Sequence, residues 1–109
     1  MEQRLFGSRQ ALYAPYLLDI EVAQVIRRYA AAGEMTPARG RAALVDLTDF
    51  PLHRCAHIFL LQRIWDLRNN LTAYDAAYVA LAEALGAPLL TRDRRLAGSA
   101  VHRAQIELI

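Results

Sequence analysis

Residues 71–97 read LTAYDAAYVALAEALGAPLLTRDRRLA, and this stretch decides the fold. It predicts a helix that Thr72 caps and Gly86 ends, followed by a short apolar strand over residues 87–91. Besides Asp75 the helix carries only one other charged residue, so it should be largely buried. A buried helix that leads into an apolar strand is typical of α/β proteins with a mainly parallel sheet.

The other segments repeat this alternation of helix and strand. In chain order they predict a helical fragment over 2–6, an extended piece over 11–15, a helix over 16–32, a helix from Thr36-Pro37 to about Thr48, a strand over 51–56, a helix over 57–68, a helical turn over 93–98 and a strand over 104–109. The sequence therefore predicts a single α/β domain over residues 1–109, with a mainly parallel sheet flanked by helices.

Composition excludes several classes of protein. With 55% hydrophobic residues, 22% charged residues and a net charge of +2, the chain is neither disordered nor strongly charged. No apolar run is long enough to cross a bilayer, and the N-terminus has no signal-peptide pattern, so we expect no membrane association. The single cysteine fits a reducing, cytoplasmic environment. The sequence pI near 9.0 is compatible with an RNA partner.

The start of the sheet looks incomplete. A helix of five or six residues is not stable alone, yet the chain opens on one at 2–6. A parallel sheet also needs central strands that are apolar on both faces, and only 87–91 qualifies. We therefore expect that a first central strand is missing. The alternative is a complete chain that begins with a frayed helix.

Three carboxylates are candidate functional residues, because each lies near the start of a helix or turn: Glu21, Asp75 and Asp93. Glu21 lies three residues after Leu18 and four before Val25, so it points partly towards the apolar side of its helix. Each acid also has a purely structural explanation. Glu21 suits the helix dipole, Asp75 completes a capping box with its threonine, and Asp93 can cap the turn that follows it.

Taken together, the three acids indicate a metal site. In an α/β fold the segments that follow the strands gather along one edge of the sheet, where ligands bind. Carboxylates that converge there repel one another unless a divalent cation lies between them. Mg²⁺ or Mn²⁺ held in this way can activate water for phosphodiester cleavage.

The same residues carry a family resemblance. Residues 71–97 resemble the C-terminal signature of VapC-type PIN-domain ribonucleases, in which an aspartate opens a helix and a strand ends in T-x-D. LLDIEVAQVIRR (17–28) is similar to the helix that carries a glutamate in that family. The resemblance runs from about Leu5 to Ile109.

The resemblance implies a PIN-like three-layer fold and a metal-dependent endoribonuclease. It further implies the toxin half of a toxin–antitoxin pair, with an RNA substrate, a cognate VapB-like antitoxin and homodimerisation. Glu21, Asp75 and Asp93 match three of the family's four core acids, as catalytic metal ligands for Mg²⁺ or Mn²⁺. The fourth acid ends the family's first strand, and nothing before Glu21 matches it. We therefore expect weak metal binding and low activity for the chain as printed.

Other polar residues are open to two interpretations. Arg92, Arg94 and Arg95 flank Asp93 and could hold RNA phosphates, or they form a solvated face. His53, Cys55 and His57 have a spacing in which two side chains could share a zinc ion, but a straight strand cannot bring the third to the same ion. A mixed strand is the favoured interpretation. Trp65 continues an apolar pattern and is expected in the core or in a dimer interface.

Two functional hypotheses follow. The first is a divalent-metal-dependent endoribonuclease toxin that uses Glu21, Asp75 and Asp93. The second is a PIN fold without a competent metal site that binds an antitoxin or RNA. The residue that supplies the fourth carboxylate discriminates between them.

Overall fold

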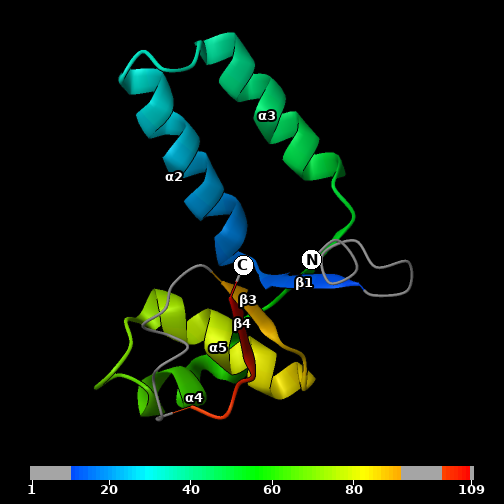
Figure 1. Ribbon diagram of the computed structural model, residues 1–109, viewed down its shortest axis with the longest axis vertical. Coiled ribbons are helices and arrows are strands. Elements are labelled where there is room, and N and C mark those ends of the chain that lie inside the picture. Colours follow the sequence, from blue (N-terminus) through cyan, green and yellow to red (C-terminus); the bar gives the residue numbers. More distant parts are fainter. Residues whose placement is uncertain (1–10, 92–101, 109) are drawn as a thin grey trace.

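The computed structural model describes residues 11–91 and 102–108, which form an α/β fold of two parallel strand pairs and surrounding helices (Figure 1). The elements in chain order are β1 (Leu12–Pro15), α2 (Leu17–Ala31), α3 (Pro37–Asp49), β2 (Leu52–Cys55), the 3₁₀ turn η1 (Ile58–Leu60), α4 (Leu61–Asp66), α5 (Ala73–Leu85), β3 (Leu89–Thr91) and β4 (Ile106–Leu108). The predicted α/β class is confirmed. The predicted fragment over 2–6 and the turn over 93–98 lie outside the described residues. None of the described helices is long and apolar enough to span a membrane.

The described strands form two pairs, not the one continuous sheet predicted. β1 lies parallel to β2 with Leu12 opposite Leu52, and β3 lies parallel to β4 with Leu89 opposite Ile106. The segment over 11–15, predicted only as extended, is thus a paired strand. β4 is the only neighbour of β3 among the described residues, so the central position of β3 stays a prediction.

A groove separates the two pairs. Its volume is about 550 Å³, and the strands that border it are β1 and β3, with α5 beside them. Its walls are largely apolar and include Leu12, Ala14, Pro15, Leu81, Pro88 and Leu90. The groove lies where the sequence predicted a further central strand, so the described residues are consistent with that expectation.

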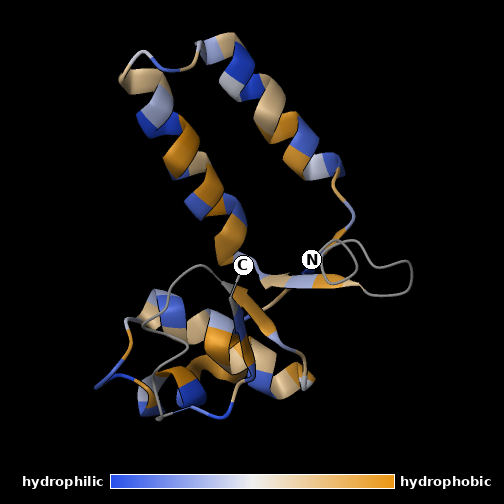
Figure 2. Cartoon of the chain, in the orientation of Figure 1, coloured by the Kyte–Doolittle hydropathy of each residue, from blue (hydrophilic) through white to orange (hydrophobic). Residues whose placement is uncertain are grey.

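Helix α5 is the buried centre of the molecule, as the sequence predicted. The Thr72 hydroxyl accepts a hydrogen bond from the Asp75 backbone N–H (3.2 Å), and Gly86 ends the helix in a left-handed conformation at φ +63°. Six of its residues are buried: Ala76, Ala77, Val79, Ala80, Leu81 and Ala82. Figure 2 shows its largely apolar composition among the strands and α4.

The core gathers around this helix in two clusters. Leu67 and Val79 form the centre of one cluster, and Leu60 and Leu81 that of the other. Ile64 of α4 packs against both clusters and so joins them. The described core therefore lies between α5 and the segment from η1 to α4.

Helices α2 and α3 form a hairpin that extends away from the strands (Figure 1). The predicted caps are confirmed: the Thr36 hydroxyl accepts a hydrogen bond from the Arg39 N–H (3.1 Å), and Pro37 occupies the first turn. A Cβ at Gly40 would lie 3.0 Å from the Ile26 methyl, so glycine lets the helices approach closely.

The inward stripe predicted for α2 is only partly correct. Val25 and Tyr29 are each 46% exposed, because the outer half of the hairpin has only α3 to pack against. In Figure 2 apolar and hydrophilic residues alternate along both helices of the hairpin. Only the first turns of α2 therefore lie near the body of the molecule.

The helix predicted over 57–68 is also shorter than expected. It begins as the 3₁₀ turn η1 and becomes α-helical only at Leu61. No side chain caps either start, and Phe59 is 76% exposed, so neither capping nor packing stabilises a longer α-helix. Trp65 is 62% exposed, so it does not lie in the core, and its alternative place in a dimer interface stays a prediction.

One ion pair ties α4 to α5. Arg63 donates two hydrogen bonds to the Glu83 carboxylate, at 2.7 and 2.9 Å, and the Arg103 backbone N–H donates a third at 2.6 Å. The Glu83 side chain is only 9% exposed. The hydrogen bonds from Arg63 are the main reason why the pKa of Glu83 lies below its ordinary value. Glu83 therefore connects the C-terminal segment to the core.

We expect Glu83→Gln to destabilise the fold by about 1–2 kcal/mol at pH 7, because charge-assisted hydrogen bonds are lost. Since the folded-state pKa is lowered, this stability is complete above the unfolded pKa of about 4.3 and is lost as pH falls through the folded value. Urea unfolding from pH 7 to 3 measures it, with exposed Glu34→Gln as the control. A deficit that persists undiminished at pH 3 would contradict this assignment.

The groove also predicts self-association. Strands with an unpaired edge pair with other chains, so we expect concentration-dependent oligomers at micromolar concentration. Ala11 is exposed at the groove next to β1, and a lysine there should oppose pairing. Light scattering should give a larger mean mass for the wild type than for Ala11→Lys. A wild-type monomer over the whole range would show that this edge is protected.

Candidate functional site

The centre of the candidate site is a contact between α2 and α5. The Tyr78 hydroxyl donates a short hydrogen bond to Oε1 of Glu21, across 57 residues of sequence. Glu21 lies in the second turn of α2, which follows the end of β1 almost directly, and Tyr78 lies on the buried helix α5. Both side chains are half-buried. The sequence-predicted Glu21 is therefore held at the junction of two helices.

Asp75 lies in the first turn of α5, three residues before Tyr78, so the two side chains lie on the same face of the helix. The pKa of Tyr78 is raised above its ordinary value. Burial is the largest cause, followed by the hydrogen bond to Glu21 and by the negative charges of Glu21, Asp19 and Asp75. Glu21 is bonded to this phenol and Asp75 lies one turn before it on α5, so both predicted residues belong to the surroundings of Tyr78.

A third acid near this phenol is engaged elsewhere. Asp19 accepts a hydrogen bond from Nε of Arg54 at 2.8 Å, and Arg54 also donates to the Leu47 carbonyl. The hydrogen bond to Asp19 is the main cause of a raised pKa at Arg54. Oδ1 of Asp19 is buried and has no hydrogen-bond partner among the described residues. Asp19 therefore links α2 to β2 and to the end of α3.

Asp93, together with Arg92, Arg94 and Arg95, lies outside the described residues, and the predictions about these four are not tested. Within residues 11–91 and 102–108 no group of three or more side chains is arranged as metal ligands. The described part of the predicted site consists of Glu21, which is bonded to Tyr78, and Asp75, which lies one turn before Tyr78 on α5.

The carboxylates on these two helices are the type of ligand that a hard divalent cation binds. Mg²⁺ and Mn²⁺ prefer oxygen ligands, and Glu21 and Asp75 supply only oxygen. Asp19 is paired with Arg54, so it is not counted among these donors. These donors match the chemistry that the sequence predicted, and a full ligand set requires residues beyond the described ranges.

The alternative zinc pattern has a structural explanation. The His53 ring stacks on Tyr13 of β1, with ring centres 4.9 Å apart. Cys55 is half-buried and its thiol lies 3.8 Å from the His53 carbonyl. His53 and Tyr13 face each other in the register of β1 and β2, so the stacking follows from the pairing.

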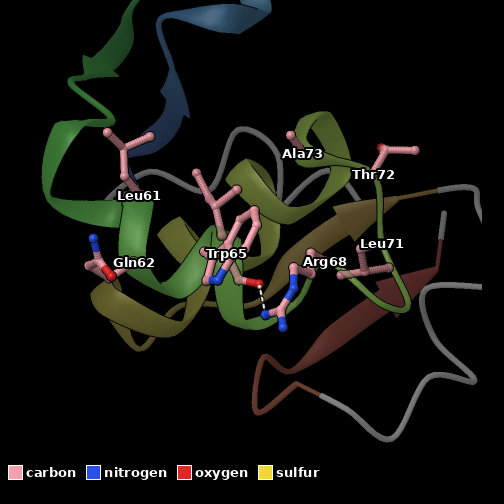
Figure 3. Close-up of a pocket in the computed structure, with 8 residues that line it drawn as sticks. Leu61, Gln62, Trp65, Arg68, Leu71, Thr72 and Ala73 are labelled. Carbon is pink, nitrogen blue, oxygen red and sulfur yellow. Dashed lines mark hydrogen bonds between the residues drawn. The ribbon is translucent and has the colours of Figure 1, made fainter.

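A larger hollow of about 720 Å³ lies at α4 and the turn before α5 (Figure 3). Arg68 lies over the Trp65 ring, 4.4 Å from its centre, and donates to the Trp65 carbonyl at 3.0 Å. Among the described residues, the walls of this hollow hold no carboxylate. This hollow lacks the groups that hydrolytic chemistry needs, so the acidic cluster is the better candidate site.

Sequence reasoning missed the role of Tyr78 and placed it only on an apolar face. One signal could have indicated it. A tyrosine on a buried helix needs a partner for its hydroxyl, and this one lies one turn after a candidate acid. Asp19 was missed too, because its partner Arg54 is 35 residues away.

Comparison with known proteins identifies the family that the chain resembles. The PIN domain family model matches residues 2–100. The chain is 40% identical to VapC ribonuclease Mb0985 of Mycobacterium bovis over 108 residues, which cover 99% of this chain and 85% of that protein. It is 44% identical to ribonuclease VapC1 of Mycobacterium tuberculosis over 97 residues, 88% of this chain and 73% of that protein.

A further relative, ribonuclease VapC12 of Mycobacterium tuberculosis, is 39% identical over 98% of this chain and 81% of its own length. The α/β fold with parallel strand pairs agrees with the PIN domain match. The chain belongs to the PIN-domain family, and its relatives there are VapC-type ribonucleases.

Proposed function

We propose that this chain is a divalent-metal-dependent endoribonuclease, the toxin of a toxin–antitoxin pair. The single observation that carries the proposal is the hydrogen bond from Tyr78 to Glu21, which ties one predicted acid on α2 to the helix that carries another, Asp75. The relatives that bear the name ribonuclease support the reaction class.

Glu21, Asp75 and Asp93 would hold Mg²⁺ or Mn²⁺, and a bound cation of this kind supplies an activated water and stabilises the anionic transition state. The residues of the chain have separate tasks. Glu21 and Asp75 bind through oxygen, and Tyr78 holds one oxygen of Glu21. Arg92, Arg94 and Arg95 would orient the RNA backbone by pairing with phosphates.

The proposed partners are RNA as the substrate, a VapB-like antitoxin and a second copy of the chain in a homodimer. RNA and an antitoxin both place the protein in the cytoplasm. Trp65, Phe59 and Ile58 form an exposed apolar surface on η1 and α4, which is compatible with one of the protein contacts.

A second candidate function is a non-catalytic PIN module that binds antitoxin or RNA. One observation favours it: a groove lies between β1 and β3, where the strand that carries the fourth acid is expected. Metal binding and RNA cleavage separate the two candidates.

We expect Mn²⁺ to raise the melting temperature by a small amount, since a ligand that binds only the folded state stabilises it. A triple variant, Glu21→Gln with Asp75→Asn and Asp93→Asn, should lose this response and melt higher without metal, because carboxylate repulsion is relieved. Asp46→Asn, an exposed acid on α3, is the control. An identical response to Mn²⁺ in the wild type and the triple variant would exclude the shared metal site.

RNA cleavage tests the enzyme directly. We expect the printed chain to be nearly inactive, and a version extended at its N-terminus by an apolar strand ending in aspartate to cleave RNA with Mg²⁺ or Mn²⁺. Within the extended version, Glu21→Gln or Asp75→Asn should lower the rate by about 100-fold or more, as the loss of transition-state charge stabilisation does. Asp46→Asn should retain activity.

Changing the added aspartate to asparagine should leave the extended version folded but inactive. Equal cleavage by the aspartate and asparagine versions would contradict the proposal. An extended version that is folded but neither cleaves RNA nor binds metal would favour the binding module.

A further inference from the structure

We propose that Tyr78 is a positioning residue, which holds the Glu21 carboxylate in place for a divalent cation while leaving its full negative charge. This inference rests on the function proposed above and deepens it. The observation behind it is the hydrogen bond from the Tyr78 hydroxyl to Oε1 of Glu21. This bond joins α5, which has six buried residues, to α2, which has none.

Glu21 needs such a contact because its own helix does not hold it firmly. No residue of α2 is buried, and neighbouring Ile20 is 68% exposed. A glutamate has three rotatable bonds and loses considerable entropy when it is held in one geometry. A ligand that is free to rotate would bind a cation weakly, so an external restraint is required.

Tyr78 has the rigidity that Glu21 lacks. It lies between the buried residues Ala77 and Val79 on a helix capped at both ends. A tyrosine ring has only two rotatable bonds, and here the ring lines the groove beside Leu81 and Pro15. The hydroxyl is therefore held in one position, and its hydrogen bond restricts the Glu21 carboxylate to one orientation.

The chemical nature of the donor matters as much as its rigidity. Asp19 and Glu21 lie two residues apart on α2, and they have different partners. Asp19 is bound by the guanidinium of Arg54, which neutralises it, whereas Glu21 is bound by a phenol. A phenol is a neutral hydrogen-bond donor at neutral pH. Glu21 is thus oriented without losing its charge.

This difference assigns separate roles to the two acids. A carboxylate that is paired with arginine gains little from a cation, so Asp19 serves the fold. A carboxylate held by a neutral donor keeps both its charge and one oxygen, Oε2, for a metal. Partners of this kind behind a ligand typically change metal affinity by about 10–100-fold when they are removed.

Tyr78→Phe removes one oxygen and keeps the ring, so it is the test variant. Tyr74→Phe is the matched control, because Tyr74 lies one turn earlier on α5 and is 63% exposed. Electron paramagnetic resonance titration with Mn²⁺ alone measures free and bound metal, and thermal melting in EDTA measures the metal-free fold. We expect Tyr78→Phe to weaken Mn²⁺ binding by about 10-fold or more. Tyr74→Phe should bind like the wild type.

A double-mutant cycle separates positioning from a merely structural role. In a Glu21→Gln background, Tyr78→Phe should have no further effect on Mn²⁺ affinity, because the group it positions is gone. Glu21→Asp keeps the charge but shortens the reach by one methylene, so it should lose affinity to a similar extent. This second variant leaves Tyr78 in place and tests the proposal even if Tyr78→Phe melts much lower than the wild type.

The outcomes distinguish this inference from the function on which it rests. If the wild type and Glu21→Gln bind Mn²⁺ equally, the proposed metal site is wrong. The positioning role of Tyr78 is then wrong as well. If Glu21→Gln loses binding but Tyr78→Phe binds like the wild type, only the positioning role is overturned. An equal effect of Tyr78→Phe in the wild-type and Glu21→Gln backgrounds would also overturn it.

Discussion

The burial of α5 is the constraint on which the rest of the described structure depends. Four of its six buried residues are alanines, and such small side chains let neighbouring elements approach the helix closely. As a result α5 contacts β1, β3, η1 and α4. Thr72 and Gly86 fix its two ends, so its position and rotation are set. Every polar group on the helix then has a fixed place, and a fixed place is what a functional site requires.

Two polar contacts make use of this fixed helix in different ways. Glu83 at its C-terminal half is neutralised by Arg63, and the pair joins α4 and the C-terminal segment to α5. Tyr78 in the middle of the helix holds Glu21 of α2 with a neutral group. Arginine thus compensates charge where the contact serves stability, and the phenol preserves charge where the contact serves the candidate site. Asp19 and Arg54 follow the first pattern on the neighbouring helix.

The parts of the fold that depend on local chemistry could be predicted from the sequence. The caps at Thr36, Thr72 and Gly86 are read from a few residues, because a side-chain oxygen or a left-handed glycine satisfies its own helix end. The exposure of α2 could not be predicted in this way, since it depends on how far the hairpin extends beyond the body. The contact between Tyr78 and Glu21 spans 57 residues, and no local pattern encodes such a distance.

The groove and the predicted acids are related through the two strands that border the groove. Both strands that border the groove lead towards predicted acids: β1 ends at Pro15 shortly before α2 and Glu21, and β3 ends at Thr91 shortly before Asp93. A strand that filled the groove parallel to both would end at the same edge, because the carboxyl ends of parallel strands lie together. An acid at its last position would then join Glu21. The predicted strand, apolar and ending in a carboxylate, would therefore fit both the groove and the predicted site.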